Sequence, residues 1–229
     1  MATAKGRTSG FVIGITAAVV VVLIALVGVV VWMNNKATDP GAAPKGSIIN
    51  SDTGAITTGT GTDKVTLFVD FQCPVCKNFE TAYGADLQKL AKDNKITLEY
   101  HPIAILDRLS QGTNYSSRSG GSAYCVAQSK PSSFLDYLNT LFANQPAENS
   151  TGLTDAQLVD YAKQSGADKA ADCITKQTYF KYPTAQATAH QITGTPTVEV
   201  NGARLDLTKA TDLAKLTAIL TKNGIQPGQ

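Results

Sequence analysis

The chain has 229 residues, of which 43% are hydrophobic and 17% charged, with a formal net charge of +2. This near balance and the absence of a basic tract argue against nucleic acid as a partner. One apolar segment near the N-terminus inflates the hydrophobic share, and the remainder has the composition of a single soluble domain.

Residues 11–33 form that uncharged apolar segment, which is long enough to cross a bilayer of about 30 Å as a helix. Lys5 and Arg7 precede it, whereas only Lys36 follows closely. The positive-inside rule then places residues 1–10 in the cytoplasm and the rest outside the cell. We therefore expect a single-pass protein of the cell membrane. A cleaved signal peptide and a buried helix stay open as alternatives.

Residues 34–53 are rich in asparagine, alanine, glycine, proline and threonine, which predicts a flexible linker before a domain at 54–229. Within that domain, residues 54–59 predict a short edge strand. Residues 65–71 are nearly all apolar, as is typical of a strand buried on both faces.

Cys73-Pro74-Val75-Cys76 follows this strand directly. The spacing places both thiols on one helical turn, and the free N–H groups at a helix start stabilise a thiolate at Cys73. Pro74 suits the first helical position. We expect a reversible redox pair. A structural disulfide within the motif stays open, as does a zinc site that also uses Cys125, Cys173, His101 or His190.

The helix expected after the motif has an apolar face made of Cys76, Phe79, Tyr83, Leu87 and Leu90. The same periodicity leaves four residues for solvent, namely Lys77, Glu80, Asp86 and Lys89. Residues 96–100 alternate and predict a second core strand. A strand, a helix and a strand in this order indicate a parallel βαβ unit.

A helical insertion is expected at about 104–190, where strand signals are weak. Its helices are predicted near 119–129, 132–144, 154–165 and 168–189, with a capping box at Thr154 and Gln157. Asn201-Gly202 between residues 197–200 and 203–205 indicates a β-hairpin with a type I′ turn. A last helix is expected at about 207–222. The fold class is therefore α/β with a helical insertion.

The motifs of this chain resemble those of DsbA-like proteins of the thioredoxin superfamily, closest to the membrane-anchored actinobacterial type. The likeness rests on residues 70–76, the insertion, and Gly194-Thr195-Pro196-Thr197 before the hairpin. The stretches 101–108, 141–146 and 200–202 add to it. The resemblance covers roughly residues 50–222 and implies a thioredoxin-like fold.

The resemblance also implies an extracytoplasmic thiol-disulfide oxidoreductase that introduces disulfide bonds into secreted or cell-envelope proteins. Cys73 would be the nucleophile and Cys76 the resolving thiol, with Pro74 and Val75 in the active-site loop. Thr195–Pro196 would be a cis peptide whose backbone edge receives the substrate. Cys125 and Cys173 would form a second, structural disulfide, worth about 4 kcal/mol on the chain-entropy model.

The implied partners are reduced or unfolded secreted proteins and a membrane reoxidase resembling VKOR or DsbB. We expect no cofactor, no metal and a monomer. Two other functions stay open: a reductase or isomerase of the same fold, and an anchored chaperone or binding module without redox turnover. Pro74 and the lack of a dimerisation module argue against the isomerase, and the intact cysteine pair argues against the binding module.

Two positions depart from the family pattern. Strongly oxidising relatives have histidine where this chain has Val75, so we expect a less depressed Cys73 pKa here. Many relatives carry a buried glutamate at the position of Leu67. Asp70 is the nearest carboxylate, and it either takes over proton transfer or caps the loop. His101 and His190 are expected to be structural, with a site-facing His190 as the alternative.

Overall fold

In the computed structural model, residues 22–30 and 40–226 are described. Residues 22–30 form a helix, and the rest of the expected anchor at 11–33 lies outside the described residues. Among the helices of the described part, none is long and apolar enough to cross a membrane. The packed unit begins at Pro40. It therefore takes in much of the expected linker, and Ile49 from that stretch lies in the core.

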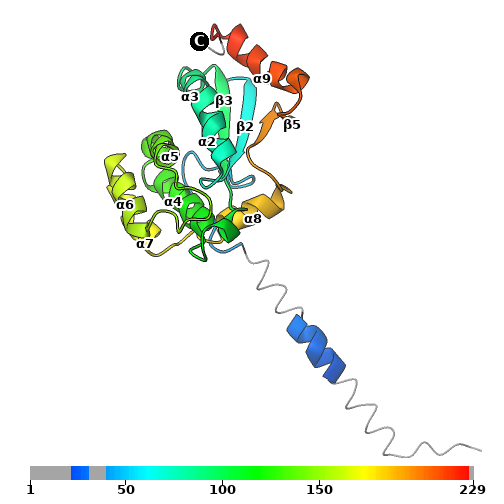
Figure 1. Ribbon diagram of the computed structural model, residues 1–229, viewed down its shortest axis with the longest axis vertical. Helices are drawn as coiled ribbons and strands as arrows, with labels where there is room; N and C mark the ends of the chain where they lie inside the picture. Colours follow the sequence, from blue (N-terminus) through cyan, green and yellow to red (C-terminus); the bar gives the residue numbers. More distant parts are fainter. Residues whose placement is uncertain (1–21, 31–39, 227–229) are drawn as a thin grey trace, which may run out of the picture. The chain divides into compact units, whose positions relative to one another are not determined.

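A five-stranded sheet in the order β1-β3-β2-β4-β5 forms the centre of this unit. The strands are β1 (Ile56–Thr58), β2 (Asp63–Val69), β3 (Ile96–Pro102), β4 (Thr197–Val200) and β5 (Ala203–Arg204). β2 and β3 are parallel, as the βαβ prediction required, and the other pairs are antiparallel. Figure 1 shows α2 (Pro74–Phe79) and α3 (Ala85–Lys92) lying alongside β2 and β3.

The two faces of β2 pack against different clusters, which explains its unbroken apolar run. Val65, Leu67 and Val69 join the main core together with residues of α2 (Pro74–Phe79), α3 (Ala85–Lys92) and α9 (Ala210–Lys222). Phe68 points to the opposite face, where it packs with Ile103, Ile192 and Ala187 of α8 (Tyr182–Ala189). Both faces are therefore covered, as a parallel central strand requires.

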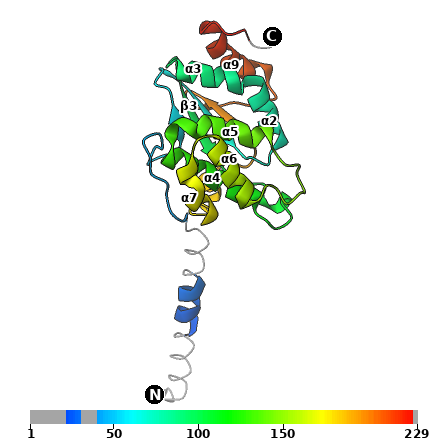
Figure 2. The same cartoon turned by 90° about the vertical axis from the view of Figure 1, so that its left-hand side faces the viewer.

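The insertion lies between β3 and β4, as predicted. Its α-helices are α4 (Tyr115–Ser129), α5 (Phe134–Ala143), α6 (Asp155–Gln164), α7 (Ala171–Thr175) and α8 (Tyr182–Ala189), with short 3-10 turns at Asp107–Leu109, Pro131–Ser133 and Asp168–Ala170. Helices α4, α5, α6 and α7 lie together in both views (Figures 1 and 2). The single helix predicted at 168–189 is wrong, because Gln177 has a φ of 49° and ends the first helical stretch.

The helix after the cysteine motif contains a π-helical turn, Glu80–Gly84, between α2 and α3. Glu80 lies four residues after the buried Cys76, on the same side of the helix, so it faces inward and is 8% exposed. The prediction that Glu80 faces solvent is therefore wrong. Tyr100 donates a hydrogen bond to Glu80 Oε2 at 3.1 Å, while Oε1 has no partner among the described residues.

Two local predictions are confirmed. Thr154 and Gln157 form the capping box at the start of α6. Asn201 and Gly202 have φ values of 51° and 81°, as the type I′ hairpin between β4 and β5 requires.

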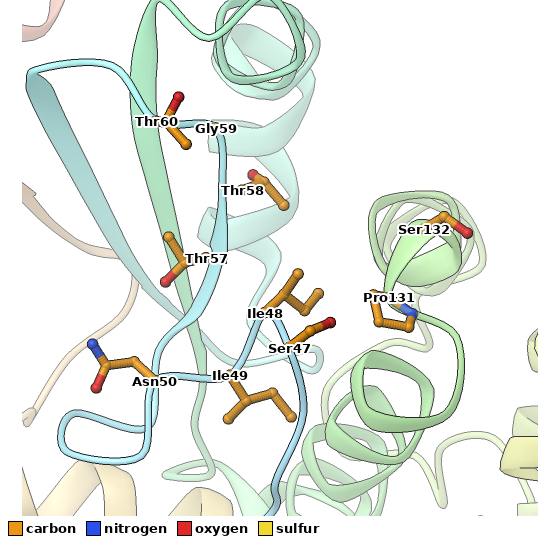
Figure 3. A pocket seen from close by; sticks show the side chains of 10 residues that line it. All are labelled: Ser47, Ile48, Ile49, Asn50, Thr57, Thr58, Gly59, Thr60, Pro131 and Ser132. Atoms are coloured by element: carbon orange, nitrogen blue, oxygen red, sulfur yellow. The ribbon is translucent and has the colours of Figure 1, made fainter.

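A groove of about 630 Å³ lies at the β1 edge of the sheet. Figure 3 shows it between the strand carrying Thr57 and Thr58 and the turn at Pro131 and Ser132. Its remaining lining residues are Ser47, Ile48, Ile49, Asn50, Gly59 and Thr60. None of these residues belongs to the cysteine motif or to the Thr195–Pro196 loop, so the groove is separate from the redox pair.

Candidate active site

The two thiols of the motif lie at the start of α2, immediately after β2. Cys73 is the N-cap residue, with extended φ and ψ of −80° and 115°, and Pro74 opens the helix. The Cys73 N–H donates to the Asp70 carbonyl at 3.0 Å, which turns the chain from strand to helix. Cys73 and Cys76 are free thiols and both are buried, at 5% and 0% exposure. The structure therefore describes the reduced pair.

The environment separates the acidities of the two thiols. A hydrogen bond from the Cys76 side chain, helped by the backbone N–H groups of Cys76 and Val75, lowers the pKa of Cys73 to about 6 against the opposing effect of burial. Burial, followed by the hydrogen bond to Cys73, raises the pKa of Cys76 well above its usual value. At neutral pH Cys73 is thus the thiolate and Cys76 the protonated partner, which is the expected division of roles.

The loop before β4 completes the site. Thr195–Pro196 is a cis peptide, which confirms the sequence prediction for this bond. In its thiol form Cys73 donates through Sγ to the Thr195 carbonyl at 3.3 Å, across 122 residues of sequence. Val75 is 56% exposed beside the pair. A substrate chain that approaches Cys73 therefore meets the Thr195 backbone and an apolar side chain.

Asp70 is fully buried but directs its carboxylate to backbone N–H groups. Its Oδ1 accepts from Gln72 at 2.9 Å, and its Oδ2 accepts from Ile105 and Leu106 at 2.9 and 3.1 Å. Burial raises the pKa of Asp70, and these bonds oppose the shift. With both oxygens occupied, the contacts favour the loop-capping role over proton transfer.

Two glutamines that the motif analysis did not single out also hold the active-site loop. Gln72 is buried, and its Nε2 donates to the Leu109 carbonyl at 2.9 Å. Gln145 donates from Nε2 to the Phe71 and Cys73 carbonyls at 3.1 and 2.9 Å. The sequence signalled Gln145 only as part of the family-like stretch 141–146, because its partners are far away along the chain.

The two histidines lie together on the face of the sheet that Phe68 occupies. Phe68 stacks on His101 with ring centroids 4.4 Å apart, and the two histidine rings are 4.6 Å apart. His190 Nε2 donates to the Thr53 carbonyl at 2.9 Å. Burial, and then the neighbouring His190, lowers the pKa of His101 to about 3. These contacts give both residues structural roles.

Cys125 in α4 and Cys173 in α7 form a disulfide with their Cα atoms 5.7 Å apart, which confirms the expected pairing. This bond removes Cys125 and Cys173 from the candidate ligands of the zinc alternative.

A family model described as thioredoxin matches residues 57–222, which is most of the chain. The chain belongs to the thioredoxin family. It is 32% identical to oxidised DsbA of Mycobacterium tuberculosis, with 76% of this chain and 95% of that chain covered and a TM-score of 0.64. It is 31% identical to DsbG of Mycobacterium tuberculosis, with 76% and 89% covered and a TM-score of 0.66. These likenesses confirm the resemblance and define a DsbA-like protein disulfide oxidoreductase.

Two further similarities have a lower identity or a smaller coverage. MdbA of Actinomyces oris shares the fold at 24% identity, with 84% of this chain and 93% of that chain covered and a TM-score of 0.63. The serine/threonine-protein kinase PknE of Mycobacterium tuberculosis is 34% identical over 115 residues, which are 48% of this chain and 20% of the kinase. The DsbA-like chain thus spans about a fifth of that relative's length.

The Val75→His variant of this DsbA-like enzyme should lower the Cys73 pKa below about 6, by roughly one further unit, because an imidazolium beside the sulfur favours the thiolate. The reduction potential of the pair should rise by about 30 mV as a result. Thiolate absorbance at 240 nm against pH measures the first effect, and glutathione equilibration the second. A Val75→Leu variant serves as the uncharged control, and an equal shift in both variants would contradict the charge argument.

Proposed function

We propose that this enzyme oxidises thiols and introduces disulfide bonds into secreted or cell-envelope proteins. The supporting observation is the Cys73 thiolate at the start of α2, with a pKa lowered to about 6. A stabilised thiolate favours the reduced pair, and a pair that favours reduction is a strong oxidant when it carries its disulfide.

The reaction begins with the Cys73–Cys76 disulfide. A substrate thiolate attacks Cys73 Sγ, the bond between the two cysteines breaks, and Cys76 leaves and takes up a proton. A second substrate thiolate then attacks the substrate sulfur of the mixed disulfide, and Cys73 leaves as the thiolate. The substrate loses two electrons and gains one disulfide, while the enzyme pair gains two electrons. The high pKa of Cys76 keeps it protonated and therefore slow to attack the mixed disulfide.

We also propose where this reaction takes place and which partners take part in it. Residues 11–33 would anchor the chain in the cell membrane, with residues 1–10 inside and a monomeric catalytic domain outside. The substrates would be reduced or unfolded secreted proteins, and a membrane reoxidase of VKOR or DsbB type would restore the disulfide. The Cys125–Cys173 disulfide supports a location in an oxidising compartment, because disulfides persist there.

The direction of electron flow is tested by the reduction potential and by donation to a reduced secreted protein with two cysteines. We expect a potential above about −200 mV and one substrate disulfide formed per oxidised enzyme. The Cys73→Ala variant should donate nothing, and the Cys76→Ala variant should accumulate mixed disulfides. A C-terminal alkaline phosphatase fusion, which is active only outside the cytoplasm, tests the location.

The similarity to DsbG keeps a reductase or isomerase as the second candidate. A potential near about −270 mV, together with reduction of substrate disulfides, would favour that function and overturn the oxidase proposal.

A further inference from the structure

Among the side chains of the helical insertion that contact the active-site loop, Gln145 binds the backbone of the redox pair. Gln145 follows α5, and its Nε2 donates to the carbonyls of Phe71 and Cys73 at 3.1 and 2.9 Å. A primary amide carries two N–H donors, so both are used on this loop. The bond to Cys73 spans 72 residues of sequence. It therefore connects the insertion to the redox pair directly.

Cys73 is therefore bound through both its side chain and its backbone. The Thr195 carbonyl contacts its sulfur from the side of the cis-proline loop, while Gln145 binds its backbone carbonyl from the side of α5. The same Cys73 carbonyl accepts the Lys77 N–H at 3.2 Å, in the first turn of α2. Position and direction of the Cys73 peptide are therefore set by the sheet, the helix and the insertion together.

The direction of these carbonyls matters for the sulfur. A carbonyl oxygen carries partial negative charge, and one that turns toward Cys73 Sγ would disfavour the thiolate. The N–H groups of Val75 and Cys76 stabilise the thiolate only while the helix start keeps them aimed at the sulfur. The amide of Gln145 binds the Phe71 and Cys73 carbonyls, so it keeps these oxygens turned away from the sulfur. The same bonds fix the helix start, so the N–H groups of Val75 and Cys76 stay aimed at the sulfur.

We propose that Gln145 is a positioning residue for thiol–disulfide exchange, because its amide binds the Phe71 and Cys73 carbonyls and so fixes the Cys73 sulfur at the start of α2. The role is independent of the direction in which electrons flow, so it would hold for an oxidase and for a reductase alike.

The Gln145→Met variant tests this proposal, because methionine has a similar length but no N–H donor. We expect the Cys73 pKa to rise from about 6 by roughly half to one unit. The rate of alkylation by iodoacetamide at pH 6.5 should fall by up to about threefold, in step with the thiolate fraction. In a Gln145→Glu variant a carboxylate would face the two carbonyls, and the rise in the Cys73 pKa should be larger.

Asn144→Met is the matched control. Asn144 is the neighbouring amide, and among the described residues its Nδ2 donates within its own helix, to the Thr140 carbonyl at 2.9 Å. This variant should leave the Cys73 titration unchanged at 240 nm. Gln145 is only half-buried, and thermal unfolding confirms that each variant is folded before it is titrated. The proposal is overturned if Gln145→Met and Gln145→Glu titrate like the wild type, or if the Asn144 control shifts as much.

Discussion

Replacing both Cys125 and Cys173 by alanine should lower the free energy of unfolding by about 4 kcal/mol. The disulfide closes a loop with a sequence separation of 48, and it joins α4 to α7. Without the disulfide the unfolded chain has more conformational entropy, which stabilises the unfolded state. The folded state changes little, since Cys125 is already packed in the main core. For a domain of this size, the melting temperature should fall by roughly 8–16 °C.

Urea unfolding of the wild type and the double variant measures this loss. The matched control is the Cys73→Ala, Cys76→Ala double variant, which removes the same two side-chain types but no bond from the reduced protein. A loss below about 1 kcal/mol in the Cys125 and Cys173 variant would show that helix packing alone holds the insertion together.

Glu80 should make the stability of the domain depend on pH. Burial raises the pKa of Glu80 to about 7 from an ordinary 4.5, and the hydrogen bond from Tyr100 only partly opposes this. The folded state therefore binds this proton more tightly than the unfolded state. The stability linked to Glu80 is complete below about pH 4.5, and it is lost as the pH rises through about 7.

In the Glu80→Gln variant the side chain has the same shape, is neutral at every pH, and can still accept the Tyr100 hydrogen bond. Between pH 4.5 and 8, the Glu80→Gln protein should gain about 3 kcal/mol of stability relative to the wild type, which corresponds to the shift of the Glu80 pKa. Urea midpoints at the two pH values measure this gain.

The exposed Glu148 offers the control through Glu148→Gln, which should change the two urea midpoints equally. A Glu80→Gln protein whose advantage is the same at both pH values would show that the buried carboxyl is not the titrating group.

Much of the architecture was predictable because it depends on neighbours in the sequence. A nearly continuous apolar run placed β2, the alternation of apolar residues placed β3, and Asn201-Gly202 placed the hairpin. Thr154 and Gln157 placed the start of α6. Each of these signals is a preference of a few adjacent residues, so periodicity and turn chemistry are sufficient to find them.

The burial of Glu80 could not be found in the same way. A charged side chain is normally assigned to solvent, and the charge of Glu80 hides the fact that it lies four residues after the buried Cys76, on the same side of the helix. Gly84 lies next to the carboxyl, where a Cβ atom would clash with Glu80 Oε2. The inward position of Glu80 thus depends on the space that a neighbouring turn leaves and on Tyr100 from another strand.

The sequence by itself determined the chemistry of this protein, because Cys73 and Cys76 belong to one helical turn after a buried strand. Only the tertiary structure decided what surrounds the reactive sulfur. Thr195 approaches Cys73 across 122 residues and Gln145 across 72, and Asp70 turns to backbone groups of a distant loop. Contacts at such separations arise from how the sheet and the insertion pack, and local sequence preferences do not encode them.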